Sequence, residues 1–193
     1  MSTKKTKTMM VSSDEQLAVL ASPVRIEIIG AFQTQGPCSI RELATAMDRP
    51  ADGLYHHIRK LLNAGILRVQ ETRKTERRDE AVYTLVAERV GGKMKQPSPT
   101  GKETLIKSAA TVMRLATREF ATAIKAGEPP CQGETRRLLV SRQKAWLTDE
   151  ALAELSDLLS RIEKLLLKHN RRKEGRLYVL TSVLVPLVKR RRV

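Results

Sequence analysis

The chain has 193 residues, 41% of them apolar but only 3% aromatic, so its core must be built mainly from aliphatic side chains, which favours helices. The 36 Lys and Arg exceed the 21 Asp and Glu and give a formal net charge of +15 at pH 7, which predicts attraction to a polyanion. The two cysteines, Cys38 and Cys131, lie far apart and outside any paired ligand motif. This spacing argues against a disulfide framework or a structural zinc site, and we expect Cys38 to be a small buried or half-buried residue rather than a redox-sensitive thiol.

Residues 1–13 are polar and carry three lysines. They lack the apolar stretch of a secretory signal, and no run in the chain approaches the roughly 18 apolar residues that span a bilayer. We therefore expect a disordered basic N-terminus over residues 1–13 and a cytoplasmic protein with no membrane partner.

Two helices are predicted next. Residues 14–20 form a short helix with apolar contacts from its leucines and valine. After a break, Ser22 fits an N-cap with Pro23 at the first helical position, where the missing N–H of proline is harmless. The second helix then runs from Pro23 to about Gln33, before Gly36 and Pro37 end it.

A pair of helices joined by a tight polar turn follows. Ser39 and Glu42 form an S-x-x-E capping box, which predicts a helix start at Ser39. The turn spans residues 48–50, and a second helix over residues 51–64 ends at Gly65, which supplies a left-handed cap. This pair has the pattern of a helix-turn-helix.

A β-hairpin is expected after Gly65, with strands over residues 66–72 and 81–85 and a charged turn over 73–80. Helices followed by such a hairpin make a winged helix-turn-helix, here residues 14–90. The overall expectation is a mainly α fold with a small β-hairpin: this N-terminal domain plus a largely helical C-terminal region for dimerisation or effector binding.

Four sequence blocks occur in order and at similar spacing in a known family: L-A-S-P-V-R-I-E-I-I, S-I-R-E-L-A, L-Y-H-H-I-R-K-L-L-N-A-G-I-L and R-R-D-E-A-V-Y-T-L. Together they resemble the ArsR-type winged-helix regulators over roughly residues 14–86, most specifically over residues 57–66. The resemblance implies a winged-helix fold and DNA binding and, because repressors dominate that family, repression. Metal-sensing members carry paired cysteines where residues 40–47 stand here without cysteine, so metal sensing is not expected at that position.

The outward face of the helix over residues 51–64 supplies candidate contacts to DNA. The N-terminal part of a recognition helix enters the major groove first, so Tyr55 and His56 are candidates for base contacts, and Arg59 and Lys60 for base or phosphate contacts. Arg49 and the backbone N–H groups after Pro50 can hold a phosphate at the helix N-terminus. The wing over residues 73–78 adds cations, with a solvated turn of local ion pairs as the alternative. The candidate DNA-binding residues are Arg49, Ala51, Asp52, Tyr55, His56, Arg59, Lys60, Arg73, Lys74, Arg77 and Arg78.

Two of these positions have other interpretations. Asp52 can simply favour the positive end of the helix dipole. His57, next to His56, invites a metal role, but its place between the inner and outer helix faces favours packing or a phosphate contact, with His169 as the remaining histidine. We expect no metal site, no catalytic residues and no cofactor, because no phosphate loop, nucleophile motif or metal spacing occurs.

The second half begins with an expected linker over residues 91–100. A long helix over 101–125 carries an apolar stripe at helical spacing, listed here in order: Leu105, Ile106, Ala109, Met113, Ala116, Phe120 and Ile124. Thr148 is expected to cap a helix that runs to about His169, and residues 177–188 read as a strand whose Pro186 places it at an edge or marks its end. The C-terminal region thus covers residues 101–193.

Three uses of this region stay open. The helices over 101–125 and 148–169 can form a homodimer interface, they can form a core within one chain, and a pocket near Phe120 and Trp146 can bind a small apolar effector. The favoured hypothesis is a homodimeric DNA-binding transcriptional regulator, a repressor rather than an enzyme, that reads double-stranded operator DNA through residues 51–64 and the wing 73–78. The alternative is a winged helix for protein interaction or RNA binding without sequence-specific DNA binding.

Overall fold

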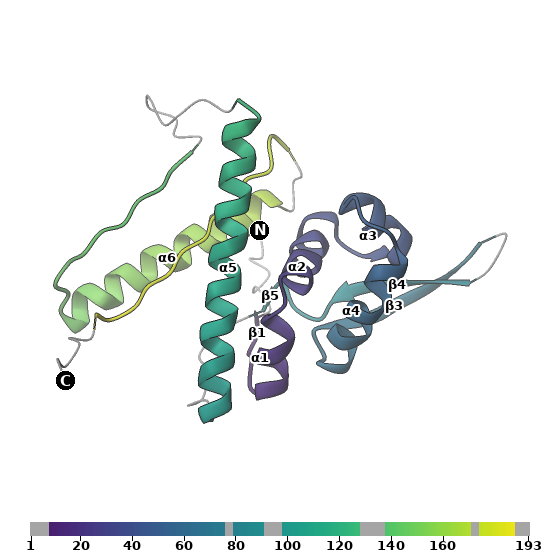
Figure 1. The fold of residues 1–193 in the computed structure, drawn as a ribbon, viewed down its shortest axis with the longest axis horizontal. Helices are drawn as coiled ribbons and strands as arrows, with labels where there is room; N and C mark the ends of the chain where they lie inside the picture. The colour runs from purple at the N-terminus through teal and green to yellow at the C-terminus, as the bar shows by residue number, and fades with distance from the viewer. Residues whose placement is uncertain (1–7, 76–78, 91–97, 128–137, 171–173, 188–193) are drawn as a thin grey trace, which may run out of the picture.

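The computed structural model describes residues 8–75, 79–90, 98–127, 138–170 and 174–187. Its elements, in chain order, are β1 (Thr8–Met9), α1 (Asp14–Leu20), α2 (Pro23–Gln35), β2 (Cys38–Ser39), α3 (Ile40–Ala46), α4 (Asp52–Asn63), β3 (Leu67–Lys74), β4 (Asp79–Leu85), β5 (Arg89–Val90), α5 (Pro99–Lys125) and α6 (Asp149–Asn170). Helices dominate, and a small antiparallel sheet ends in a long hairpin (Figure 1). The expected fold class, a winged helix-turn-helix with a largely helical C-terminal region, is confirmed.

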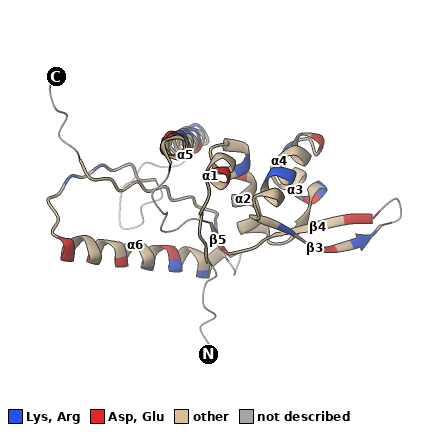
Figure 2. Cartoon of the chain, turned by 90° about the horizontal axis from the view of Figure 1, so that it is seen from below, with Lys and Arg blue, Asp and Glu red and all other residues tan. Residues whose placement is uncertain are grey.

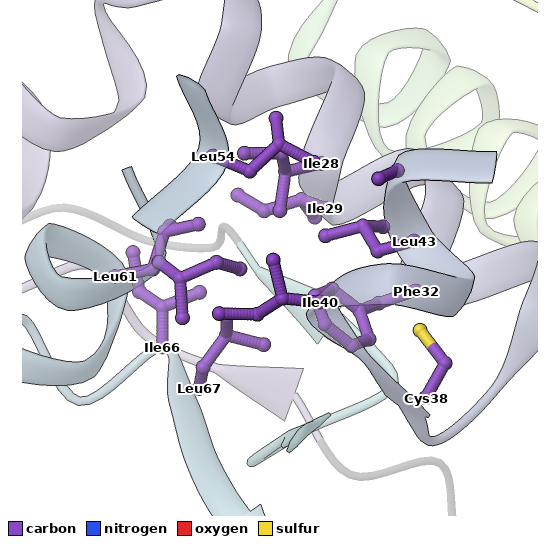
Figure 3. Close-up of a cluster of buried hydrophobic side chains, with 12 residues drawn as sticks. Ile28, Ile29, Phe32, Cys38, Ile40, Leu43, Leu54, Leu61, Ile66 and Leu67 are labelled. Atoms are coloured by element: carbon purple, nitrogen blue, oxygen red, sulfur yellow. The ribbon is translucent and has the colours of Figure 1, made fainter. Parts of the chain in front are cut away.

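The core of the winged helix lies where α2, α3 and α4 meet the start of the sheet (Figure 3). Ile28, Leu43 and Leu61 are each fully buried there, one from each helix. The sheet has the order β2-β4-β3 with antiparallel neighbours, so β4 lies in the middle. Cys38 is buried in this cluster, as expected.

The capped ends of the helices agree closely with the sequence. The N–H of Ser39 donates to Glu42 Oε2 at 2.7 Å and the N–H of Glu42 donates to Ser39 Oγ at 3.3 Å, which confirms the capping box. Gly65 has φ +67, the left-handed conformation expected after α4. Ser22 precedes α2 with Pro23 at the helix start, but its side chain makes no capping hydrogen bond.

The hairpin is longer than predicted. Arg73 and Lys74 belong to β3 and pair with Glu80 and Asp79 of β4, so the expected charged turn over 73–80 is wrong at both ends. Cross-strand pairs of opposite charge stabilise these strand ends. In the sequence the same charged residues look like a turn, so the strands were predicted too short. No local sequence signal indicates the two-residue strand β2, which pairs with Tyr83 and Val82 of β4.

The N-terminal boundary also needs correction. Residues 1–13 were expected to be disordered, yet β1 pairs in parallel with β5, Val11 is buried, and Ser13 caps α1 through a bond from the N–H of Gln16. Residues 1–7 lie outside the described part. A strand of two residues has no detectable periodicity, so only its distant partner reveals it.

Helix α5 docks on the winged helix instead of following a free linker. Ser98 caps α5 and Pro99 and Thr100 lie in its first turn, so the predicted linker over 91–100 extends too far; residues 91–97 are outside the described segments. Gly101, Thr111 and Leu115 are the buried residues of α5, which packs along α1 (Figures 1 and 2). The hydroxyl of Thr111 donates to the carbonyl oxygen of Ala21 at 3.2 Å.

Helix α6 and its flanking segments lie away from the three-stranded sheet (Figures 1 and 2). Thr148 caps α6 as expected, accepting from the N–H of Ala151 at 3.3 Å, but α6 has no buried residue. The strand predicted over 177–188 is wrong for its described part: residues 177–187 are extended and belong to no sheet. A strand needs a hydrogen-bonded neighbour, which apolar composition alone does not supply.

Among the described helices, none alone is long and apolar enough to cross a membrane. Only α1 and α2 taken together, with a bend of 85° between them, reach the necessary length and composition.

Candidate nucleic-acid interface

Helix α4 has one buried face and one exposed face. Leu54, Ile58 and Leu61 are at most 1% exposed and anchor the helix on the core. Tyr55 is 44% exposed on the other side. The remaining predicted contacts on this side are also exposed: Asp52, His56, Arg59 and Lys60. One face thus fixes the helix while a polar, cation-bearing face is free to enter a groove.

The N-terminus of α4 follows a tight turn. Asp48 has φ +50, a left-handed conformation that reverses the chain between α3 and α4. Ala51, the N-cap residue, has helical backbone angles and no side-chain cap, so the first N–H groups of the helix have no capping side chain. Such groups favour an anion, which agrees with the phosphate role predicted for this turn.

Arg49 lies in the turn and is already oriented by the protein. Its Nη2 donates to Glu27 Oε2 at 3.0 Å, and its side chain stays 36% exposed. Arg49 and Arg41 line the same open surface depression at the end of α3. Arg41 was not among the predicted contacts, although its side chain is 65% exposed. Its position two residues after the N-cap Ser39 places it on the outward side of α3, and this spacing could have identified it.

The described part of the wing carries balanced charge. Arg73 donates from Nε to Glu71 Oε1 at 2.9 Å and from Nη1 to Glu42 Oε1 at 3.1 Å. In Figure 2 the outer end of the hairpin is basic on β3 and acidic on β4, as the pairing of Lys74 with Asp79 requires. The structure therefore ties Arg73 to α3 and leaves Lys74 exposed. The predicted contacts Arg77 and Arg78 lie outside the described residues.

The pair of Arg73 and Glu42 joins the wing to the capping box of α3. The N–H of Ser39 is the main cause that holds the pKa of Glu42 below its usual value, with burial opposing it and the charge of Arg73 assisting. Glu42 therefore stays ionised and accepts hydrogen bonds from the N–H of Ser39 and from Arg73 of β3 at the same time. This contact fixes the outer end of β3 relative to the helix-turn-helix.

His57 lies at the border of the two faces of α4, as expected. Its Nδ1 is buried and has no hydrogen-bond partner among the described residues. Burial lowers the pKa of His57, and the positive charges of Arg25, His56, Lys60 and Arg49 lower it further. The ring centroids of His56 and His57 are 5.7 Å apart in an edge-on contact. Within the described segments no group of three or more His, Cys, Asp or Glu is placed to hold a metal ion.

The comparison with protein families agrees with this geometry. Residues 20–70 match the model of a helix-turn-helix domain. The match runs from the end of α1 into β3 and includes α2, α3, the turn and α4. A search of curated proteins found no match to the chain. The matched domain type supports a DNA-binding regulator in general.

Proposed function

We propose that this protein is a transcriptional regulator of the ArsR-like winged-helix type that binds operator DNA as a homodimer and acts as a cytoplasmic repressor without enzymatic activity or cofactor. Helix α4 enters the major groove, the turn at Arg49 and Ala51 holds a phosphate, and the wing with Arg73 and Lys74 lies beside the backbone. Two copies place their recognition helices about 34 Å apart, one turn of the duplex. The resemblance to ArsR-type proteins supports repression as the sign of regulation.

The single observation that carries the proposal is the exposed face of α4. Tyr55, His56, Arg59 and Lys60 project from a helix whose opposite side is anchored by fully buried leucine and isoleucine. Tyr55 and His56 supply hydrogen-bonding groups for base edges, and Arg59 and Lys60 supply positive charge for bases and phosphates. A formal net charge of +15 adds attraction to the duplex that does not depend on sequence.

The homodimer is proposed to form through residues 101–125 and 148–169. Its support is the apolar stripe of α5, whose Ile106 is 70% exposed, and the complete absence of buried residues in α6. Binding of a small apolar effector by the same region remains a prediction. Trp146 is 99% exposed, so the described part of one chain does not enclose it.

The proposal is tested by sequencing the DNA that co-purifies with the protein and measuring affinity for the resulting site by fluorescence anisotropy. We expect at least tenfold preference for that site over a scrambled duplex, since base contacts contribute about 1–3 kcal/mol each. The double substitution Tyr55→Ala with Arg59→Ala should remove the preference.

The alternative is a winged helix that binds RNA or another protein. It predicts no sequence preference for duplex DNA, and an affinity for single-stranded or structured RNA that exceeds the affinity for any duplex. If the double substitution left the preference for the operator intact, the assignment of α4 as the recognition helix would be wrong.

A further inference from the structure

Helix α5 has two different faces. The face that packs against α1 is made of small or polar residues such as Gly101 and Thr111, together with Leu115. The apolar stripe seen in the sequence points the other way: Ile106, Met113 and Ile124 are 70%, 48% and 47% exposed. Because large apolar side chains at helical spacing need cover, this outer face of α5 requires a partner.

Residues 177–187 form a second apolar surface. The segment contains no Asp, Glu, Lys or Arg. Its large side chains are exposed on both sides of the extended backbone: Leu177, Val179, Val183 and Val185 alternate with Tyr178, Leu180 and Leu184, and all are between 53% and 75% exposed. An extended run that is apolar on both sides is typical of a strand buried within a protein, not of a surface segment.

The backbone of this segment also lacks partners. No backbone hydrogen bond joins residues 177–187 to another described residue, and the same holds for residues 138–147. Buried backbone N–H and C=O groups are almost always hydrogen-bonded. A partner that buries this segment must therefore supply a strand for its backbone hydrogen bonds as well as apolar side chains for its surface.

We propose that residues 177–187 form a β-strand with an extended segment of a second copy of this chain, and that the outer faces of α5 and α6 cover the resulting shared sheet. The inference rests on the homodimer in the proposed function and defines its interface. Figure 2 shows the extended segments 138–148 and 174–187 on one side of α6 and separated from it, running in roughly the direction of the helix. Each copy thus carries a helix and two extended segments that become one two-layer core when a second copy is added.

A second copy fits this segment better than a different partner because the segment itself is uncharged, although the chain as a whole is strongly basic. The protein has a formal net charge of +15, and a distinct partner drawn to it would be acidic. Residues 177–187 offer such a partner no cation, only apolar side chains and unpaired backbone. A two-fold axis instead places the same patch on both subunits, so an uncharged apolar surface is complementary to itself.

The test uses the full chain without DNA. Sedimentation equilibrium gives the mass at micromolar concentration, and hydrogen exchange with mass spectrometry follows the amides of residues 177–187. We expect a dimer with slow exchange in this segment, and faster exchange as dilution releases the monomer. A monomer at micromolar concentration would overturn the proposal, and so would a dimer in which these amides exchange as fast as those of an unfolded peptide.

A pair of matched valines tests the interface directly. Val183 is 57% exposed in the segment and Val69 is 49% exposed on β3 of the wing. Val183→Asp should weaken dimerisation at least about tenfold, because it places an unpaired charge in the apolar interface. Val69→Asp should leave the dimer unchanged. Slow exchange over residues 28–67 in both variants shows that the winged helix is still folded, and equal dimerisation of the two variants would contradict the proposal.

Neither measurement includes DNA, so its result is independent of operator binding. A chain that dimerises through residues 177–187 but prefers no duplex sequence would support this interface and overturn the proposed function.

Discussion

Arg49, in the turn of the helix-turn-helix, donates a hydrogen bond to Glu27 of α2, with 3.0 Å between Nη2 and Oε2. The other carboxylate oxygen of Glu27 accepts from Nη2 of Arg118 on α5. One carboxylate, only 21% exposed, therefore joins the turn that is proposed to hold a phosphate to the helix that is proposed to dimerise. Residues 22 and 91 positions away in sequence meet at Glu27.

Replacing Glu27 by Gln should lower the free energy of unfolding by about 1 kcal/mol, since hydrogen bonds to charged groups are stronger than neutral ones but partial exposure screens them. Two arginines then lose their counter-charge at the same position. Urea denaturation at a fixed protein concentration measures the change.

Glu15→Gln, at an exposed position of α1 outside both proposed dimer helices, is the matched control for Glu27→Gln, and it should change the free energy of unfolding by less than about 0.5 kcal/mol. If both substitutions changed the free energy of unfolding equally, the contacts of Glu27 with the turn and with α5 would not contribute to stability.

Two serines at helix N-caps provide a comparison within the same domain. Ser39 makes a capping hydrogen bond, whereas Ser22 makes none. Ser39→Ala should lower the free energy of unfolding by about 1 kcal/mol and Ser22→Ala by only a few tenths. Thermal denaturation of both variants at one protein concentration measures the difference, and equal losses would contradict a role for the capping box.

The lowered pKa of His57 predicts a pH dependence of stability. Burial lowers the pKa first, and the surrounding cations lower it further, so the folded protein binds this proton less readily than the unfolded chain. The folded state therefore keeps its full stability above the pKa of an unfolded histidine, about 6.5. It loses stability as the pH falls below that value, because the unfolded chain then takes up the proton more readily. His57→Gln should flatten the stability profile below about pH 6.5.

His169→Gln, in the last turn of α6, is the matched substitution for this pH test and should keep the wild-type profile. Chemical denaturation across the pH range gives both profiles. A wild-type slope that survives in His57→Gln would show that another group causes it.

The contacts of Arg73 predict the effect of a wing mutation on DNA binding. Glu71 accepts from Arg73 at 2.9 Å and places a negative charge on the wing. Glu71→Gln should tighten operator binding about two- to fivefold, because it removes repulsion of phosphate and frees part of the guanidinium. Anisotropy titration measures the affinity, with Glu15→Gln on α1 as the matched charge change away from the wing. Unchanged or weaker binding would place the wing away from the DNA backbone.

Much of the helix-turn-helix was predictable because its signals are local. The capping box at Ser39, the left-handed Gly65 and the two faces of α4 each depend on residues within a turn or two of one another. The exposed set on α4 followed directly from the positions of its three buried residues. Which of these side chains touch DNA stays a prediction, since contact with a partner is not a local property.

What the sequence missed was decided by distant contacts. The strands β1 and β2, the true length of the hairpin and the docking of α5 each depend on partners far along the chain, as does the ion pair that gathers Glu27, Arg49 and Arg118. The apolar stripe of α5 was found from periodicity, yet only the structure shows that it faces outward while the smaller face packs on α1.

The sequence by itself determined the local elements and their amphipathic faces, because helix caps, turns and periodicity depend on neighbouring residues. Only the tertiary structure decided which apolar face is buried within the chain and which stays exposed, because burial depends on the surfaces that meet in three dimensions. Residues 177–187 illustrate the difference: their composition is that of a strand, and no strand within the described part of the chain pairs with them.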